Sequence, residues 1–312
     1  MAKYFKTLDE QVELLRGRGL IIENEDKAKD KLLNYNFYKL VNGTREFFCR
    51  DDNPYVYRKG VEFRELNKLH EFDKEIKTHF LNSILDIERH LRSIISYVFM
   101  KSHPEANSYL NPDNFNGEKA LITTNISTFV KTIDNYKEEE NYKKSISHYS
   151  NKYKHVPFWF LINFISFGKL INFYQTMKEE EAYEVANIFT KFLTDNIEEA
   201  EGYYITVKQF ESAILNIKNV RNIVAHDNLI LSYKFDQDIY YIKPIHDKWE
   251  IGIEDRRNDL FNVYLVSQLF LSKSQFRELT FNIQKSLEDL DGEIDEIAYE
   301  KLIKSLGFPE EF

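Results

Sequence analysis

The sequence predicts an all-α protein, and three observations support this fold class. The 312 residues include only 10 Gly and 6 Pro, well below the usual shares of about 7% and 5%, so turn-forming residues are scarce. From Val61 to Met100 neither residue occurs, and apolar residues recur at steps of three and four, as on one face of a long helix. The 25 Phe and 20 Tyr suffice for a large core. A β-sandwich, a barrel or a Gly-rich nucleotide-binding fold is therefore disfavoured.

Residues 1–60 are predicted to form an N-terminal helical segment. Thr7 and Glu10 make a T-x-x-E capping box at the start of a first helix, which ends near Gly19. A second short helix is expected over 26–33, before the aromatic-rich stretch NYNFYKLVNG. This segment elaborates the helical core that follows it.

The helical core is predicted over residues 61–228, and a C-terminal extension over residues 229–312. Besides the long helix at 61–100, we expect core helices at 118–138, 140–152, 158–177, 179–197 and 206–225. Residues 229–253 are rich in β-branched and aromatic side chains with turn-like DQD and HDK between them, which favours a small β-hairpin or an ordered loop. Further helices are expected at about 257–271, 274–290 and 293–306.

Charge and composition exclude several classes of protein. With 42 basic and 51 acidic residues the net charge is −9, which excludes a broad, charge-driven grip on nucleic acid. A single cysteine, Cys49, is typical of a reducing compartment, so a cytoplasmic location is expected. The most apolar stretch, 156–174, contains Asn163 and Lys169, which favours a buried helix over a membrane span. The histidines show no metal-site spacing and no phosphate-binding loop is present, so we expect neither metal nor cofactor.

The most informative stretch is NVRNIVAHDN, residues 219–228, which carries Arg221, Asn222 and His226 in an R-N-x-x-x-H pattern. Asn222 and His226 are four residues apart and share one face of a helix. Arg221 and His226 are five apart, about 140° around a regular helix. They converge only with the help of the long arginine side chain, a loosened last turn or a second copy of the chain.

These three residue types suit the cleavage of RNA. A histidine with a pKa near 6.5 acts as an acid or base at neutral pH, and a guanidinium binds a phosphate and stabilises developing charge. Asn222 would orient the imidazole or a phosphate oxygen, and a ribose 2′-OH as nucleophile requires no metal. The alternative is structural: Arg221 pairs with a carboxylate and His226 caps the helix. The spacing alone favours this alternative.

The R-N-x-x-x-H segment resembles the signature of HEPN domains, which are all-helical modules and frequently RNases. Five segments resemble, in order, the Abi-like family of bacterial abortive-infection proteins of the AbiD/AbiF type: DEQVELLRGRGLII, NYNFYKLVNG, EFDKEIKTHFLNSILDIERHLRS, VPFWFLINFISFGKLINFY and VRNIVAHDN. They span about residues 5–230. The chain departs from the family pattern at Lys39, Val41 and Asn42, and at Asp227, where a basic or aromatic residue often follows the histidine.

This resemblance implies a HEPN-like core, a role in antiphage defence and a metal-independent endoribonuclease activity. It implies Arg221 on the phosphate, Asn222 as an orienting residue and His226 as acid/base. It also implies RNA as a partner, including a structured small RNA, and a homodimer in which two motifs face one cleft. Glu88 and Arg92 lie in one of the matching segments and are candidates to support the motif. Their alternative is an i,i+4 surface ion pair worth a few tenths of a kcal/mol.

A second candidate nucleic-acid contact lies at residues 143–155. Lysines alternate there with tyrosines and no acid occurs, which suits single-stranded RNA. The expected contacts are Lys143, Lys144, Tyr149, Lys152 and Lys154. The alternative is that residues 143–155 flank a loop, with their lysines and tyrosines in contact with solvent alone.

Two other groups of residues are expected to be structural. The aromatic residues Trp159, Phe160 and Phe164 are predicted to lie in the core, and Asp73 is predicted to be a buried partner of a basic side chain. Two further functions stay open from the residues: a non-catalytic protein that holds a small RNA, and a dimeric interaction scaffold.

Overall fold

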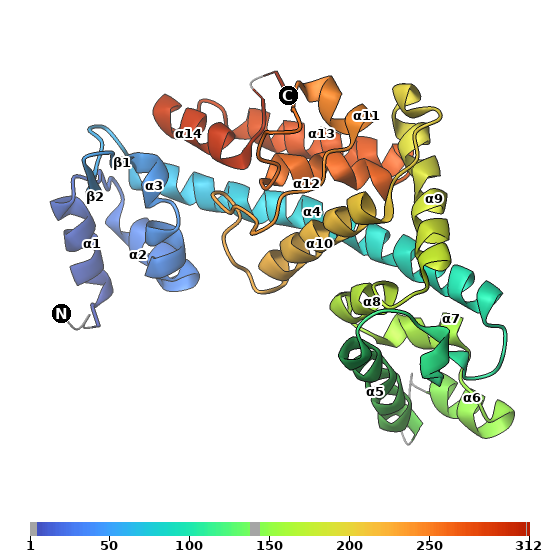
Figure 1. Ribbon diagram of the computed structural model, residues 1–312. Helices are drawn as coiled ribbons and strands as arrows, with labels where there is room; N and C mark the ends of the chain where they lie inside the picture. Colours follow the sequence, from blue (N-terminus) through green and yellow to red (C-terminus); the bar gives the residue numbers. More distant parts are fainter. Residues whose placement is uncertain (1–4, 138–143, 310) are drawn as a thin grey trace.

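One long helix organises the molecule. The computed structural model describes residues 5–137, 144–309 and 311–312, and α4 (Phe63–Ser102) runs through most of its length (Figure 1). Its 40 residues span about 60 Å at about 1.5 Å per residue. Buried residues such as Leu66, Leu69 and Phe72 recur at steps of three and four, so the predicted helix at 61–100 is confirmed. The all-α fold class is confirmed as well.

The N-terminal segment packs against the first half of α4 (Figure 1). It contains α1 (Leu8–Gly17), α2 (Glu25–Tyr35), the π-helical turn η1 (Tyr38–Asn42), α3 (Arg45–Phe48), β1 (Cys49–Arg50) and β2 (Asn53–Tyr57). The expected capping box of Thr7 and Glu10 is present at the start of α1. The two short strands form an antiparallel sheet, which the sequence did not predict.

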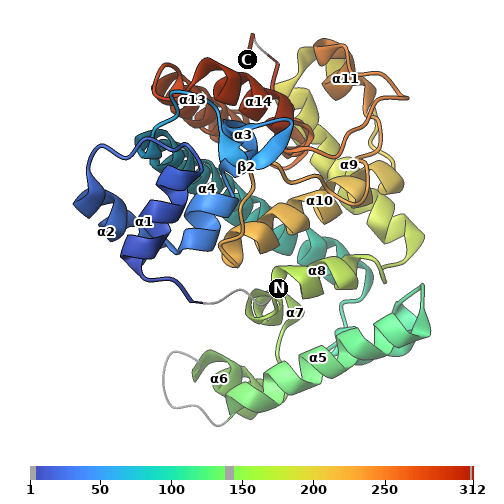
Figure 2. The ribbon, with the colours of Figure 1, turned by 90° about the vertical axis from the view of Figure 1, so that its left-hand side faces the viewer.

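The other helices surround the rest of α4 (Figures 1 and 2). They are α5 (Lys119–Lys137), α6 (Lys144–Tyr153), α7 (Phe158–Leu161), α8 (Phe167–Tyr174), α9 (Glu179–Asn196), α10 (Val207–Ala225), α11 (Lys243–His246), α12 (Leu260–Val266), α13 (Lys273–Leu290) and α14 (Glu296–Leu306). In Figure 2, α5 and α6 lie below the rest of the molecule. Among the described residues, no helix is both long and apolar enough to cross a membrane.

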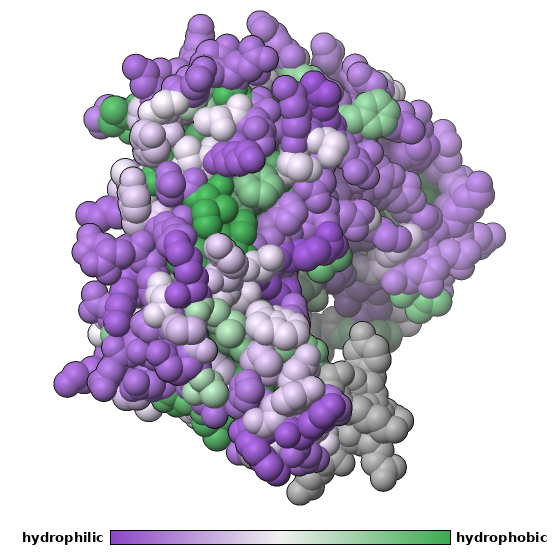
Figure 3. All heavy atoms as spheres, turned by 90° about the vertical axis from the view of Figure 1, so that its right-hand side faces the viewer, coloured by the Kyte–Doolittle hydropathy of each residue, from purple (hydrophilic) through white to green (hydrophobic). Residues whose placement is uncertain are grey.

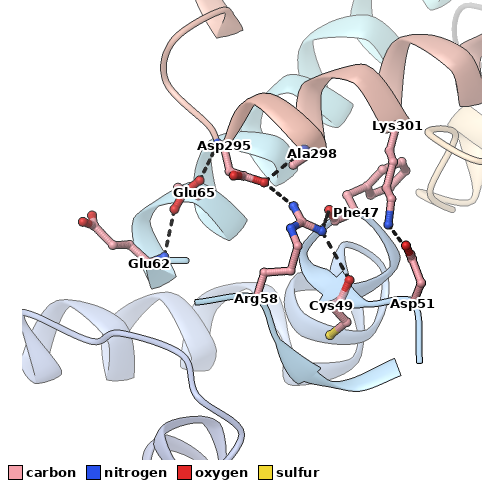
Figure 4. Close-up of polar contacts among 9 residues, drawn as sticks. All are labelled: Phe47, Cys49, Asp51, Arg58, Glu62, Glu65, Asp295, Ala298 and Lys301. Carbon is pink, nitrogen blue, oxygen red and sulfur yellow. Dashed lines mark hydrogen bonds and ion pairs between the residues drawn. The ribbon is translucent and has the colours of Figure 1, made fainter. Parts of the chain in front are cut away.

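Helix α14 fixes the N-terminal segment from the other end of the sequence (Figure 4). The Arg58 guanidinium pairs with the carboxylate of Asp295. The backbone N–H of Asp295 donates to the Glu65 carboxylate at 2.5 Å, and Lys301 Nζ lies 2.5 Å from Asp51 Oδ1. These contacts hold the segment against both α4 and α14.

Of the two structures that the sequence favours for residues 229–253, the ordered loop is present and the β-hairpin is not formed. The segment buries several apolar side chains, such as Ile230 and Phe235. Some of its backbone hydrogen bonds stay within the segment, and two others go to the loop at 257–258. The N–H of Phe235 donates to the Asn258 carbonyl at 2.8 Å, and the N–H of Ile239 donates to the Arg257 carbonyl at 2.9 Å. The β-branched and aromatic residues therefore reflect burial rather than strand pairing, and the later part of the segment contains the short helix α11.

The helix expected over 158–177 is interrupted between α7 and α8. Ile165 is extended, with φ −98° and ψ 151°, and the Ser166 hydroxyl caps α8 by accepting from the Lys169 N–H at 3.4 Å. The freed carbonyl of Ile165 accepts a hydrogen bond from Arg92 Nη2 at 3.1 Å. An apolar pattern alone does not reveal such a break, because both halves stay buried.

A single hydrophobic core runs through the described residues, from Val12 to Phe308. It crosses both expected boundaries, after residue 60 and after residue 228, which stay predictions. The helices expected at 179–197 and 206–225 agree with α9 and α10 to within a residue.

Candidate functional site

The R-N-x-x-x-H motif occupies the last turn of α10. This helix begins at a capping box between Thr206 and Gln209 and buries one apolar face. Its C-cap is His226, whose N–H donates to the Asn222 carbonyl at 3.1 Å. The spacing of four residues thus places the Asn222 and His226 side chains on one face, as expected.

Asn222 and His226 are exposed, whereas Arg221 is half-buried. Within the described part of the chain, the Asn222 amide and the His226 imidazole make no side-chain hydrogen bond. Both groups are therefore open to a ligand. The structural alternative, in which the imidazole of His226 interacts with the helix dipole, stays a prediction, since the contact seen is that of the His226 backbone N–H.

Glu88 on α4 joins Arg221 to Arg92. Its side chain is only 8% exposed, and its Oε1 lies 3.6 Å from Arg221 Nε while its Oε2 lies 3.0 Å from Arg92 Nη1. Arg92 is held further by the Ile165 carbonyl. The structure thus places Glu88 beside Arg221, whereas Arg92 contacts Glu88 and forms with it the i,i+4 ion pair of the alternative. The contact of Glu88 with Arg221 also satisfies the structural alternative, in which Arg221 pairs with a carboxylate.

Asp227, the residue after the motif histidine, reverses the chain direction. Its φ of 51° lies in the left-handed region, which glycine usually occupies at the end of a helix and aspartate tolerates. The Asp227 N–H donates to the Val224 carbonyl at 3.1 Å, and the Asn228 N–H donates to the Ile223 carbonyl at 3.0 Å. This double closure fixes the backbone directly beneath His226.

Two lysines bind the Asp227 carboxylate. Lys39 of η1 pairs with it and also donates to the Asp227 carbonyl at 2.9 Å, and Lys77 of α4 lies 2.7 Å from its Oδ1. Burial opposes ionisation, yet the hydrogen bonds from Lys39 and Lys77 lower the pKa of Asp227 to about 2. The carboxylate therefore engages the lysines rather than His226.

Asp73 of α4 is the second carboxylate that binds Lys77. Its side chain is fully buried, with Oδ2 2.8 Å from Lys77 Nζ, and its Oδ1 accepts the Ile230 N–H at 2.9 Å. Asp73 is thus a buried partner of a basic side chain, as expected. We call Lys39, Asp73, Lys77 and Asp227 the α10 clamp, because together they tie the end of α10 to α4 and η1.

Gly43 permits the closest contact between the N-terminal segment and the chain after the motif. A Cβ atom at this position would lie 1.8 Å from Leu229 Cδ1 and 2.6 Å from the Lys39 carbonyl oxygen. Only glycine fits without displacement of its neighbours. The stretch NYNFYKLVNG and the motif segment therefore pack directly on each other.

The candidate RNA-binding residues lie elsewhere. Lys143 falls outside the described residues, Lys144 begins α6 and Tyr149 is half-buried, while Lys152 and Lys154 are exposed. Helix α6 lies on the other side of α7 and α8 from the C-terminal end of α10 (Figures 1 and 2). A single chain does not bring Lys152 and Lys154 to the motif. In the described ranges, no group of three or more His, Cys, Asp or Glu residues is arranged to hold a metal ion.

The comparison with protein families decides the relationship. Residues 30–232 match the family described as Abi-like protein. The chain belongs to the Abi-like family. This membership indicates a role in abortive infection. The match includes η1, most of α2 and every element from α3 to α10, so the α10 clamp and the Glu88 contacts lie within it. Helices α11 to α14 lie beyond it. Neither the curated proteins nor the solved structures gave a match.

Proposed function

We propose that this Abi-like protein is a metal-independent endoribonuclease of the HEPN type, with Arg221, Asn222 and His226 at its active site. The observation that carries the proposal is the contrast at the end of α10. The exposed polar side chains of Asn222 and His226 stand on a backbone that is fixed by the α10 clamp. Preorganised polar groups of this kind are typical of catalytic sites.

The assigned roles follow from the contacts of each side chain. Glu88 lies near Nε of Arg221, which leaves the Nη atoms of that guanidinium to bind the scissile phosphate. Arg92 is engaged by Glu88 and the Ile165 carbonyl, so we assign it a supporting role. Asn222, one turn below His226, orients the imidazole or a phosphate oxygen.

The reaction that suits these groups is attack of the ribose 2′-OH on the adjacent phosphorus. A new P–O2′ bond forms and the P–O5′ bond breaks, which gives a 2′,3′-cyclic phosphate and a 5′-OH end. One proton leaves the 2′-OH and one reaches the 5′-oxygen, so the step uses a base and an acid. His226 supplies one of these, and the same residue of a second copy supplies the other. This requirement is our reason for proposing a homodimer.

The test compares wild type with His226→Ala and with Asn228→Ala, an exposed residue two positions later, on a single-stranded RNA oligonucleotide. We expect His226→Ala to reduce the cleavage rate by about 10²–10⁴-fold and Asn228→Ala to leave it nearly unchanged. The melting temperature should be unaffected by His226→Ala, because the imidazole is exposed. At equal expression, growth arrest should follow the cleavage rate.

Three outcomes contradict parts of the proposal. If His226→Ala cleaves RNA as well as wild type does, the nuclease assignment is wrong. If neither protein cleaves and both retain RNA in pull-downs, the chain is a non-catalytic RNA-binding protein. If EDTA abolishes the cleavage, the metal-independent mechanism fails while the assignment of His226 stands.

A further inference from the structure

The region from residue 141 to residue 178 differs in charge from the rest of the chain. It contains six lysines and no Asp, Glu or Arg. With a net charge of −9 for the whole protein, the remaining residues carry −9 − 6 = −15. The region therefore presents a local positive potential on an acidic body. It includes α6, α7 and α8.

Aromatic rings on α6 and α7 are exposed beside these lysines. Tyr153 is 49% exposed and Trp159 is 51% exposed, so the expectation that Trp159 lies in the core is wrong. Figure 3 looks onto this side of the molecule, and pale and light-green spheres gather in its lower half. A single exposed ring is ordinary on a protein surface, but neighbouring exposed rings are typical of an interaction site.

The exposed rings of Tyr153 and Trp159 pack against the half-buried ring of Tyr149. The half-buried Tyr149 ring lies 5.8 Å from that of Tyr153 and 6.1 Å from that of Trp159, centroid to centroid, and packs on Phe160 at 5.1 Å. The planes of Tyr149 and Trp159 are nearly perpendicular, at 86°. Lys152 Nζ lies 5.2 Å from the Tyr153 ring centroid. A cation therefore stands directly beside an exposed ring.

We propose that Tyr153 and Trp159, with Lys152 and Lys154, form a contact for single-stranded RNA that is separate from the R-N-x-x-x-H motif. Bases stack on the two rings and the lysines bind the phosphates on either side. A duplex hides the faces of its bases, so it gains only the phosphate contacts. The proposal rests on the proposed function only in taking RNA as the ligand. We call these four residues the stacking surface.

The charge of the region favours RNA over a second copy of the chain as the occupant. A symmetric dimer through the stacking surface would place lysine against lysine, which is destabilising. A purely apolar partner would leave the Lys152 and Lys154 ammonium groups without counter-charges. An RNA strand supplies both flat rings and negative charge.

The test measures binding and needs no cleavage. The probe is a fluorescently labelled, fully 2′-O-methylated single-stranded oligouridylate, which cannot react through its 2′-oxygen, and a duplex of equal length is the comparison. With the full-length protein, we expect Trp159→Ala to weaken single-strand binding about tenfold and duplex binding much less. Trp159→Phe, which keeps a flat ring, should restore most of the affinity.

A matched pair on another face controls for general surface effects. Phe281 of α13 is 64% exposed and Lys285 is exposed one turn later. Phe281→Ala should leave binding unchanged. Lys152→Gln should reduce the slope of log K against log[salt] by about 0.7 for each lost phosphate contact, whereas Lys285→Gln should not.

Two results would overturn the proposal. One is equal single-strand affinity for Trp159→Ala and wild type. The other is a change of oligomeric state in sedimentation for Trp159→Ala without a change in RNA affinity, which would make the surface a protein interface. Because the probe is not cleaved, failure here leaves the nuclease test intact, and an inactive His226 motif leaves this test intact.

Discussion

The end of α10 and the stacking surface both carry basic side chains, but the two regions are built in opposite ways. At the end of α10 the lysines bind carboxylates, and one of these, Asp73, is fully buried. At the stacking surface Lys152 and Lys154 are exposed, and no acidic residue lies near them in the sequence. Positive charge in the first region holds the end of α10 in place through ion pairs. In the second region it remains available for a ligand.

This difference shows why composition is a poor guide to the site. A net charge of −9 argues against a nucleic-acid-binding protein. Yet this total combines lysines that pair with carboxylates at the end of α10 and exposed lysines at the stacking surface. The paired lysines contribute little long-range attraction, because their charges are neutralised within a few ångströms. The contrast predicts that substitutions in the α10 clamp change stability, whereas substitutions at the stacking surface change binding.

The largest effect is expected from Lys77→Met. This change removes a buried cation and leaves the fully buried Asp73 carboxylate without its counter-charge. Loss of one partner of a buried pair costs about 3–5 kcal/mol, so chemical denaturation should show a drop of that size in the free energy of unfolding. The double variant Asp73→Asn/Lys77→Met should recover part of it, since the unpaired charge is gone.

The matching change at the stacking surface is Lys152→Met. Because Lys152 is exposed, the free energy of unfolding of this variant should stay within about 0.5 kcal/mol of the wild-type value. An equal loss for the two lysine variants would contradict the contrast between the regions.

A smaller effect is expected from Gly43→Ala. The Leu229 side chain can move away from the new methyl group, but the Lys39 carbonyl at 2.6 Å belongs to the backbone of η1. We expect a loss of about 1–3 kcal/mol in the free energy of unfolding. Gly168→Ala in α8 is the control, because a Cβ there meets nothing within 4 Å. A neutral Gly43→Ala would show that the two segments do not pack as closely as described.

The smallest effect concerns pH and Asp227→Asn. The folded pKa of Asp227, about 2, lies below its ordinary value of 3.8, so its contribution is full above the unfolded pKa and is lost as the pH falls towards 2. Solvent screens this 66% exposed carboxylate, so about 0.2–1 kcal/mol is at stake. Wild type should melt above Asp227→Asn at neutral pH, and the gap should close between pH 4 and 2. A gap that is constant with pH would exclude the ion pairs as its source.

Much of the fold was predictable because its signals are local. The apolar steps of α4, the Thr7 capping box and the bounds of α9 and α10 depend on residues within one or two turns. For residues 229–253 the sequence left a hairpin and an ordered loop open. The structure has the loop, because the N–H groups of Phe235 and Ile239 bond to the loop at Arg257 and Asn258. β-branched and aromatic residues indicate a buried extended chain but not which partner it takes.

The same limit applies to the site. Arg221, Asn222 and His226 share one short motif, and Glu88 and Arg92 were found through the family resemblance. Lys39 and Lys77 were missed as partners of Asp227, from which they are separated by 188 and 150 residues. No local pattern marks either lysine. The left-handed backbone conformation of Asp227 is the one feature of this cluster that the sequence indicates, since aspartate tolerates this conformation directly after a helix end.

The contacts of α14 with the N-terminal segment bear on the order in which the protein assembles during synthesis. Arg58 and Asp295 are separated by 237 residues, so the anchor beneath β1 and β2 does not exist when the first sixty residues leave the ribosome. Until residue 301 is made, the N-terminal segment that contains η1 and Lys39 lacks its contacts with α14. Translation thus delays completion of the motif's scaffold until nearly the whole described chain is present.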